Sequence, residues 1–208
     1  MRSSIKSLLT SSSSDYYFAA LFALSVLFSS LPVKAQQFCS ASDSPSYGEP
    51  PAEIRRTVEL ANLGVAVSIP ENYRTIPLQN DAIQIVHPSI FDMLQCLGSG
   101  GQGGHGYYFE TINLVEDDLT MDLEAQATWL AGYNERRDGT REPLANQIIP
   151  YENNEFSGYI VTNEQGYDVN FLGVIPGYDS LLEVSAQCDC QVDVAVMSKL
   201  LSDISVLD

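Results

Sequence analysis

Basic residues are scarce in this chain: 10 Lys and Arg stand against 27 Asp and Glu, a formal net charge of −17 over 208 residues. A protein that binds nucleic acid needs Lys and Arg to displace the counterions of the phosphates. The composition therefore excludes nucleic acid as a partner. The plainest interpretation is a solvated acidic surface that favours solubility. If the chain binds another protein, we expect that partner to present a basic surface.

Long apolar runs are also missing. The run Phe18–Phe28 has only eleven residues, whereas a transmembrane helix needs about 20. It follows the basic residues Arg2 and Lys6 and precedes small residues that end at Ala35, the pattern of a cleavable signal peptide. We therefore predict a signal peptide over residues 1–35, cleavage after Ala35, export to the periplasm or the medium, and no stable membrane span after cleavage.

Removal of that peptide would leave 7 basic and 26 acidic residues, a formal charge of −19. Residues 36–53 are rich in Ser, Pro and Gly, a composition typical of a flexible lead segment. The remainder, 54–208, has a length that suits a single domain with its own core.

Cysteines are few but even in number. In an oxidising compartment such cysteines tend to pair, and four cysteines allow three connectivities; they are Cys39, Cys96, Cys188 and Cys190. Positions two apart on a strand hold their side chains badly for a disulfide, so we expect long-range pairs that join Cys39 or Cys96 to the C-terminal pair. A redox-active Cys-x-Cys is the alternative, although the neighbouring acids Asp189 and Asp193 would raise the pKa of a thiol there.

Most of the domain has the residue pattern of strands. β-Branched and alternating apolar runs, separated by turn residues, predict seven strands; they cover 57–61, 65–69, 82–87, 107–115, 156–162, 167–175 and 180–186. The first two form a predicted hairpin, the last three an antiparallel meander, and residues 147–151 a short edge strand.

Apolar residues at spacings of three and four predict helices over 116–137 and 192–203, and a proline favours the start of a shorter helix over 88–97. Helices that each present one apolar stripe are expected to cover an antiparallel sheet. The predicted fold class is α+β, a mostly antiparallel sheet flanked by helices.

Residues 98–106 (GSGGQGGHG) form the only low-complexity segment. A glycine-rich loop that binds phosphate ends in Gly-Lys-Ser/Thr and opens a helix. This loop has no lysine and precedes a predicted strand, so we do not expect nucleotide binding.

Residues 64–73 (GVAVSIPENY) contain a glycine, an alternating strand, a proline and then an aromatic, Tyr73. This motif resembles the opening hairpin of the PsbP proteins of photosystem II and the Mog-type Ran-binding proteins, in which the aromatic is usually tryptophan. The order of elements over residues 57–207 is similar as well. The resemblance implies an α/β/α sandwich and a non-catalytic accessory or binding role, and it carries over no binding residue.

Candidate catalytic bases are few because the chain has two histidines, His87 and His105. Neither lies in a recognised hydrolase or zinc motif. An enzyme would need one of them within hydrogen-bond reach of a carboxylate or a nucleophile inside a pocket.

One acidic cluster is the best candidate for a metal site. It consists of Glu116, Asp117, Asp118 and Asp122. Calcium prefers closely spaced carboxylates, whereas acids at a helix start also cap the helix and interact with its dipole. We therefore predict no cofactor other than a calcium ion at this cluster.

These observations favour an exported, non-enzymatic accessory or protein-binding domain of the cell envelope. The alternative is a small exported hydrolase or a calcium-dependent enzyme whose site is assembled from scattered residues.

Overall fold

The structure is a computed structural model that describes residues 37–41, 49–104 and 106–207. The predicted signal peptide, residues 36 and 42–48 of the predicted lead segment, and His105 lie outside the described residues. In the part of the chain that is described, no helix is long and apolar enough to cross a membrane.

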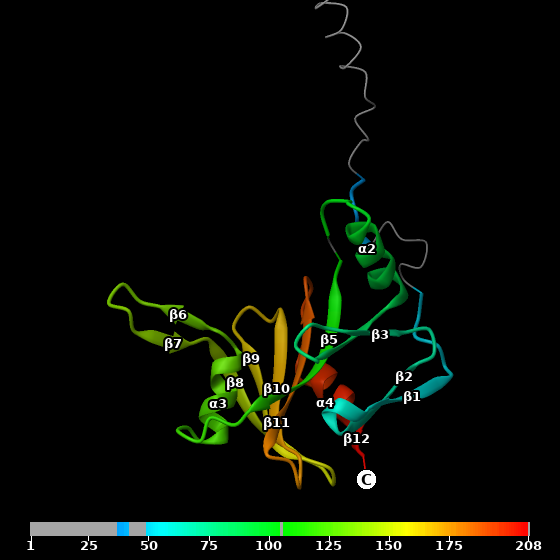
Figure 1. Ribbon diagram of the computed structural model, residues 1–208. Coiled ribbons are helices and arrows are strands. Elements are labelled where there is room, and N and C mark those ends of the chain that lie inside the picture. Colours follow the sequence, from blue (N-terminus) through cyan, green and yellow to red (C-terminus); the bar gives the residue numbers. More distant parts are fainter. Residues whose placement is uncertain (1–36, 42–48, 105, 208) are drawn as a thin grey trace, which may run out of the picture. The chain divides into compact units, whose positions relative to one another are not determined.

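A seven-stranded antiparallel sheet forms the centre of the fold (Figure 1). Its order is β3-β4-β5-β11-β10-β9-β8, and every neighbouring pair is antiparallel. The strands are β3 (Arg74–Pro77), β4 (Ile83–Val86), β5 (Tyr108–Glu116), β8 (Ala145–Glu152), β9 (Ser157–Asn163), β10 (Asp168–Val174) and β11 (Ser180–Cys188). The predicted meander is confirmed as β9 to β11, and β8 is the predicted edge strand, although it is longer than expected.

A second, three-stranded sheet has the order β1-β2-β12. The predicted hairpin is confirmed by β1 (Arg55–Leu60) and β2 (Val65–Pro70), which pair antiparallel around the short 3-10 turn η2 (Ala61–Leu63). The third strand, β12 (Ile204–Val206), follows the last helix and pairs with the other side of β2. Neither β12 nor the short strand β3 was predicted.

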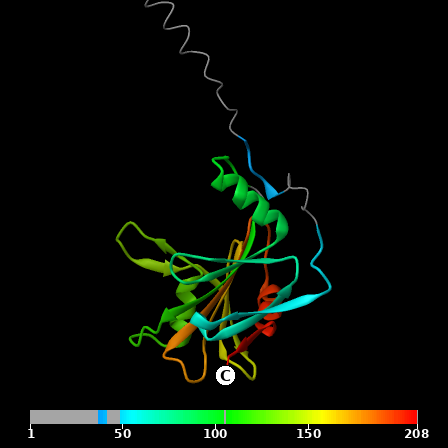
Figure 2. The ribbon, with the colours of Figure 1, turned by 45° about the vertical axis from the view of Figure 1, so that its right-hand side comes forward.

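The main core lies between one face of the large sheet and a layer built from the small sheet and α4 (Val194–Ser202). Figure 2 shows α4, in red, beside strands β1 and β2 of the small sheet, in cyan. Buried residues of the large sheet, such as Phe171 and Ile160, share this core with Val67 of β2 and Leu201 of α4. Residues at alternate strand positions point to the opposite face, where Leu172 and Val161 pack against α3 (Leu123–Leu130).

The predicted α+β content is confirmed, but the helix-flanked α/β/α sandwich is wrong. The described residues contain twelve strands in three sheets, which make the fold β-rich. A three-stranded sheet occupies much of the layer where the sandwich requires helices. The opposite face carries α3, which has eight residues. The physical reason is that β1, β2 and β12 pair with each other instead of extending the large sheet.

The predicted helix over 116–137 is wrong in both bounds. The observed helix α3 begins after Asp122, whose Oδ1 accepts a hydrogen bond from the backbone N–H of Ala125 at 2.8 Å. It ends before Gly132, whose φ of +85° is a left-handed conformation that suits glycine. The chain then forms the β6–β7 arm, a hairpin of β6 (Tyr133–Glu135) and β7 (Arg141–Pro143). The apolar periodicity of the sequence continues past the end of α3 and so does not mark that end, whereas the left-handed glycine terminates the helix.

The described cysteines form two disulfides, Cys39–Cys96 and Cys188–Cys190. The prediction of disulfide bonding is confirmed, but the expected pairing of an N-terminal cysteine with the C-terminal pair is wrong. Cys188 is the last residue of β11, and the chain turns directly after it, so the two side chains need not obey strand geometry. Their Cα atoms lie 4.9 Å apart, within the ordinary range.

The first disulfide attaches residues 37–41 to α2 (Pro88–Gly98) and to the glycine-rich loop. The backbone N–H of Cys39 donates to the carbonyl of Gln102 at 2.7 Å, and the N–H of Gln102 donates back to Gln37 at 2.8 Å. A Cβ atom on Gly101 would lie 2.2 Å from Sγ of Cys39. The loop therefore needs glycine at this position because its backbone packs on the disulfide.

Candidate functional site

A cavity of about 300 Å³ opens between the small sheet, α4 and strand β5. We call it the tyrosine cavity. Four polar side chains that line it come from three separate parts of the chain; they are Tyr73, His87, Tyr108 and Glu110. Its remaining wall is largely apolar and includes Ile69, Pro70, Val196 and Leu200. Such a combination of apolar walls and a few convergent polar groups is typical of a binding site.

Tyr73 and His87 form the first polar pair of the cavity. Tyr73 follows β2, and His87 lies at the N-cap position of α2 in an extended conformation. The hydroxyl oxygen of Tyr73 lies 2.5 Å from Nε2 of His87. Burial raises the pKa of Tyr73 to about 12, with a further contribution from the charge of Glu110. Burial also lowers the pKa of His87, so the imidazole is neutral at pH 7.

Tyr108 and Glu110 form the second pair. They lie two residues apart on β5, so their side chains project from the same face of the strand. The Tyr108 hydroxyl donates to Oε1 of Glu110 at 2.7 Å. Burial is the main cause that raises the pKa of the Glu110 carboxyl, and the hydrogen bond from Tyr108 opposes it. The side chain keeps some accessible surface because it faces the cavity, whereas its carboxyl group is surrounded by protein atoms.

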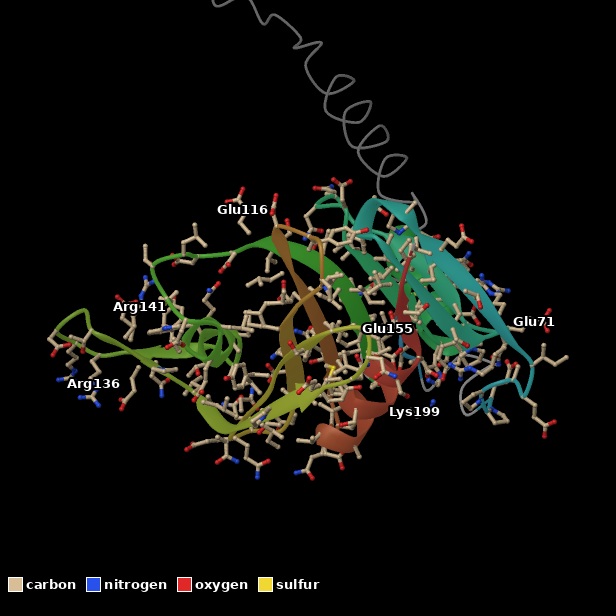
Figure 3. All side chains as sticks on the ribbon, turned by 90° about the horizontal axis from the view of Figure 1, so that it is seen from below. Glu71, Glu116, Arg136, Arg141, Glu155 and Lys199 are labelled. Carbon is tan, nitrogen blue, oxygen red and sulfur yellow. A yellow bond between two sulfur atoms is a disulfide. The ribbon has the colours of Figure 1, made fainter. Side chains whose placement is uncertain are left out.

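Charged residues also line the cavity; they are Arg55, Lys199 and Asp203. Asp203 Oδ2 accepts from Arg55 Nη2 at 2.8 Å and from Lys199 Nζ at 3.0 Å. Arg55 also donates from Nε to Oγ of Ser68 at 3.0 Å. Figure 3 shows Lys199 on α4, far from Arg136 and Arg141 on the β6–β7 arm. Because one aspartate pairs with two cations, neither cation is held by a carboxylate of its own.

The protonation states limit what this arrangement can do chemically. Proton transfer from Tyr73 to His87 is strongly unfavourable, since the pKa of the phenol is raised to about 12 and that of the imidazole is lowered. Burial likewise raises the pKa of Tyr108, so this hydroxyl also stays protonated. A general base works best with a pKa near the working pH and a nucleophile within its reach. The cavity instead presents hydrogen-bonding groups suited to recognition.

The hydrogen-bond partner of His87 is not one of the groups expected from the sequence for an enzyme, a carboxylate or a serine or cysteine nucleophile. That partner is a phenol, and the nearby carboxyl of Glu110 bonds to Tyr108 instead. The other predicted base, His105, lies outside the described residues. His87 and Tyr108 also line a second cavity of about 380 Å³, whose wall includes the Cys188–Cys190 disulfide.

The predicted acidic cluster is distributed over the loop before α3. Asp118 Oδ1 accepts from the hydroxyl and the N–H of Thr120, which lowers the pKa of Asp118. Asp117 accepts from Nε2 of Gln126, and Asp122 caps α3. Across the described ranges, no three His, Cys, Asp or Glu side chains converge as metal ligands would. Calcium binding at Glu116 and its neighbours stays a prediction for which the geometry offers no support.

Sequence reasoning missed Tyr108 and Glu110 as site residues. The available signal was the position of Glu110: it lies inside the strand-like run YYFETINLV, two residues after a tyrosine. Strand alternation places both side chains on one face, and an acid on the same face as buried apolar residues is an uncommon placement for a charged group. Tyr73 was noted only as the aromatic of the hairpin motif.

No protein-family model and no curated protein sequence matches this chain. The resemblance of residues 64–73 to the PsbP and Mog-type proteins therefore stays a prediction.

Proposed function

We propose that this chain is an exported, non-enzymatic accessory protein that binds another protein of the cell envelope, with the tyrosine cavity as the anchor site. In this proposal the partner inserts one long side chain with a polar end, the class to which tyrosine and arginine belong. Residues of that class are the ones that most often anchor protein interfaces, and they do so in well-packed pockets.

The polar lining of the cavity is the observation that carries the proposal. Two phenols, a neutral imidazole and a carboxyl group of raised pKa face a space with apolar walls. These groups are already oriented by the 2.5 Å and 2.7 Å contacts among themselves. A site whose groups are oriented before binding loses little entropy when the ligand enters.

The charge of the chain supports the choice of partner. The predicted mature chain has a formal charge of −19, which attracts a basic surface over distances of about the Debye length, roughly 8 Å at physiological salt. Such attraction raises the rate of association more than the final affinity. We therefore propose that the acidic surface steers a basic partner and that the cavity holds it.

Quantitative affinity capture tests this proposal. The chain is immobilised, exposed to the envelope fraction of its own cells, and the retained proteins are quantified by mass spectrometry. Parallel columns carry Tyr73→Phe and Glu110→Gln, which alter the cavity without changing its size, and the control Glu124→Gln. Glu124 is exposed on α3, which covers the opposite face of the sheet, and its substitution changes the charge by the same amount as Glu110→Gln.

The proposal is supported if the parent and Glu124→Gln retain the same partner and both cavity variants bind it about tenfold more weakly. A tenfold loss of affinity corresponds to the loss of about one buried hydrogen bond. Its association rate should also fall as salt rises. Equal retention by all four columns would remove the cavity from the interface, and no partner above background would contradict the binding function itself.

A further inference from the structure

The Cys188–Cys190 disulfide forms part of the wall of the second cavity, the one of about 380 Å³. Its two sulfur atoms differ in environment. Cys188 is 4% exposed at the end of β11, whereas Cys190 is exposed to solvent. The backbone N–H of Cys190 donates to Sγ of Cys188 at 3.1 Å. An external reagent can therefore reach one sulfur, while the other is held by protein and by a hydrogen-bond donor.

The other disulfide is less exposed, because Cys96 is half-buried whereas Cys190 is exposed. Cys39 is 2% exposed and belongs to the core beneath α2. The backbone of the glycine-rich loop lies directly over the bond: a Cβ atom on Gly101 would be 2.2 Å from Sγ of Cys39 and 2.9 Å from Sγ of Cys96. Exchange requires in-line access of a thiolate to one sulfur, and the loop leaves little room for that approach.

Cleavage of the C-terminal disulfide need not unfold the domain. Its cysteines are separated by two positions, against 57 for the other pair, so the bond constrains only one short turn. That turn is also held by hydrogen bonds of Asp189. Its N–H donates to the carbonyl of Tyr107 at 3.3 Å, and its Oδ2 accepts from the N–H of Gly106. Neither hydrogen bond involves a sulfur atom, so both remain when the disulfide is cleaved.

We propose that Cys188–Cys190 is a thiol–disulfide exchange site for a dithiol reductant, a class that includes small dithiols and exported dithiol proteins. A thiolate of the reductant attacks Sγ of Cys190 and forms a mixed disulfide. The Cys188–Cys190 bond breaks, and its electron pair stays on Sγ of Cys188, where the N–H of Cys190 stabilises the thiolate before water protonates it.

The second thiol of the reductant completes the step. After losing its proton to water, it attacks the reductant's own sulfur in the mixed disulfide and releases Cys190 as a thiolate, which water protonates. The reductant is oxidised to its disulfide, and the protein gains two electrons and two protons. The reverse sequence transfers oxidising equivalents from this chain to a reduced dithiol.

Differential alkylation tests the site in the intact chain. The purified folded protein is incubated with a series of dithiothreitol concentrations, quenched with iodoacetamide, then fully reduced and labelled with a heavier iodoacetamide. Peptide mass spectrometry then gives the reduced fraction of each cysteine. We expect Cys188 and Cys190 to become reduced at least tenfold faster than Cys39 and Cys96. Simultaneous reduction of both pairs, or resistance of Cys188 and Cys190 until the chain is unfolded, would overturn the proposal.

The direction of attack has its own test. Cys188→Ser leaves a thiol at the exposed position 190, and Cys190→Ser leaves one at the buried position 188. With Ellman's reagent, the exposed thiol should react at least tenfold faster than the buried one. Should either variant fail to fold, a single-thiol form of a thioredoxin-type protein can be mixed with the parent chain. The trapped mixed disulfide must then lie on Cys190, and its presence on Cys188 would refute the mechanism.

Discussion

The two disulfides should differ strongly in what they contribute to stability. On the chain-entropy relation, the Cys39–Cys96 bond, with a sequence separation of 57, contributes about 4 kcal/mol, because it restricts a long loop in the unfolded chain. The same relation gives about 1.5 kcal/mol for Cys188–Cys190, whose separation is 2. We therefore expect the double variant Cys39→Ala, Cys96→Ala to lose about 2 to 3 kcal/mol more than the double variant Cys188→Ala, Cys190→Ala.

Guanidinium unfolding at pH 7, followed by fluorescence and circular dichroism, measures both losses. In a domain of this size, 1 kcal/mol corresponds to roughly 2 to 4 °C in Tm, so the difference should also appear as a fall of about 4 to 12 °C on heating. Comparison of m-values checks that the unfolded states are alike. Equal losses, or a larger loss for the C-terminal pair, would refute the assignment of Cys39–Cys96 as the structural bond.

Three further substitutions test other features. Glu110→Gln should stabilise the fold at pH 8 and lose that advantage as the pH falls to 4. Burial raises the pKa of Glu110 in the folded chain, so at pH values above the ordinary carboxyl pKa the unfolded chain ionises this group more readily, which opposes folding. Unfolding curves at the two pH values test this, and a stability difference that does not change with pH would contradict it. Gly101→Ala should lower the free energy of unfolding by about 1 to 3 kcal/mol, because its new Cβ atom clashes with Sγ of Cys39. The control Gly98→Ala should cause no loss, because a Cβ atom there meets nothing within 4 Å. Equal thermal stability of the two variants would argue against the close contact at Gly101. Asp193→Ala removes the cap that accepts from two N–H groups at the start of α4 and should cost about 1 kcal/mol by chemical unfolding, so an unchanged midpoint would show that the cap is dispensable.

Local patterns in the sequence were enough to predict most strands and two of the helices. Strand alternation identified β9 to β11, and the glycine between β1 and β2 identified the hairpin. Elements defined by tertiary pairing were not predictable in this way. The three residues of β12 form a strand only because β2 lies beside them, and the four residues of β3 likewise form a strand by pairing with β4. The apolar periodicity that continues past Gly132 concealed the end of α3.

The α/β/α sandwich failed for a related reason. The resemblance rested on the order of elements, and that order does not specify which strands join which sheet. Here β2 is hydrogen-bonded on both sides within the small sheet, by β1 and by β12. Both edges of β2 are therefore occupied, and the hairpin packs face to face against the large sheet instead of extending it. The side chains that the hairpin buries are the same in either arrangement, so hydrophobic patterning could not distinguish them.

The candidate site was the least predictable part because its residues are joined only by the packing of two sheets. Tyr73 follows the small sheet, whereas Tyr108 and Glu110 belong to the large one. No motif or regular spacing in the sequence relates Tyr73 to Tyr108 and Glu110. Of the four acids that the sequence did group, Glu116, Asp117, Asp118 and Asp122, the three aspartates each bond to a nearby backbone or side-chain group instead. Clustering along the chain reflected local capping, whereas the isolated acid within a strand was the one that faces a cavity. In a β-rich fold of this kind, a charged residue on the buried face of a strand is therefore the better indicator of a polar group that lines a cavity.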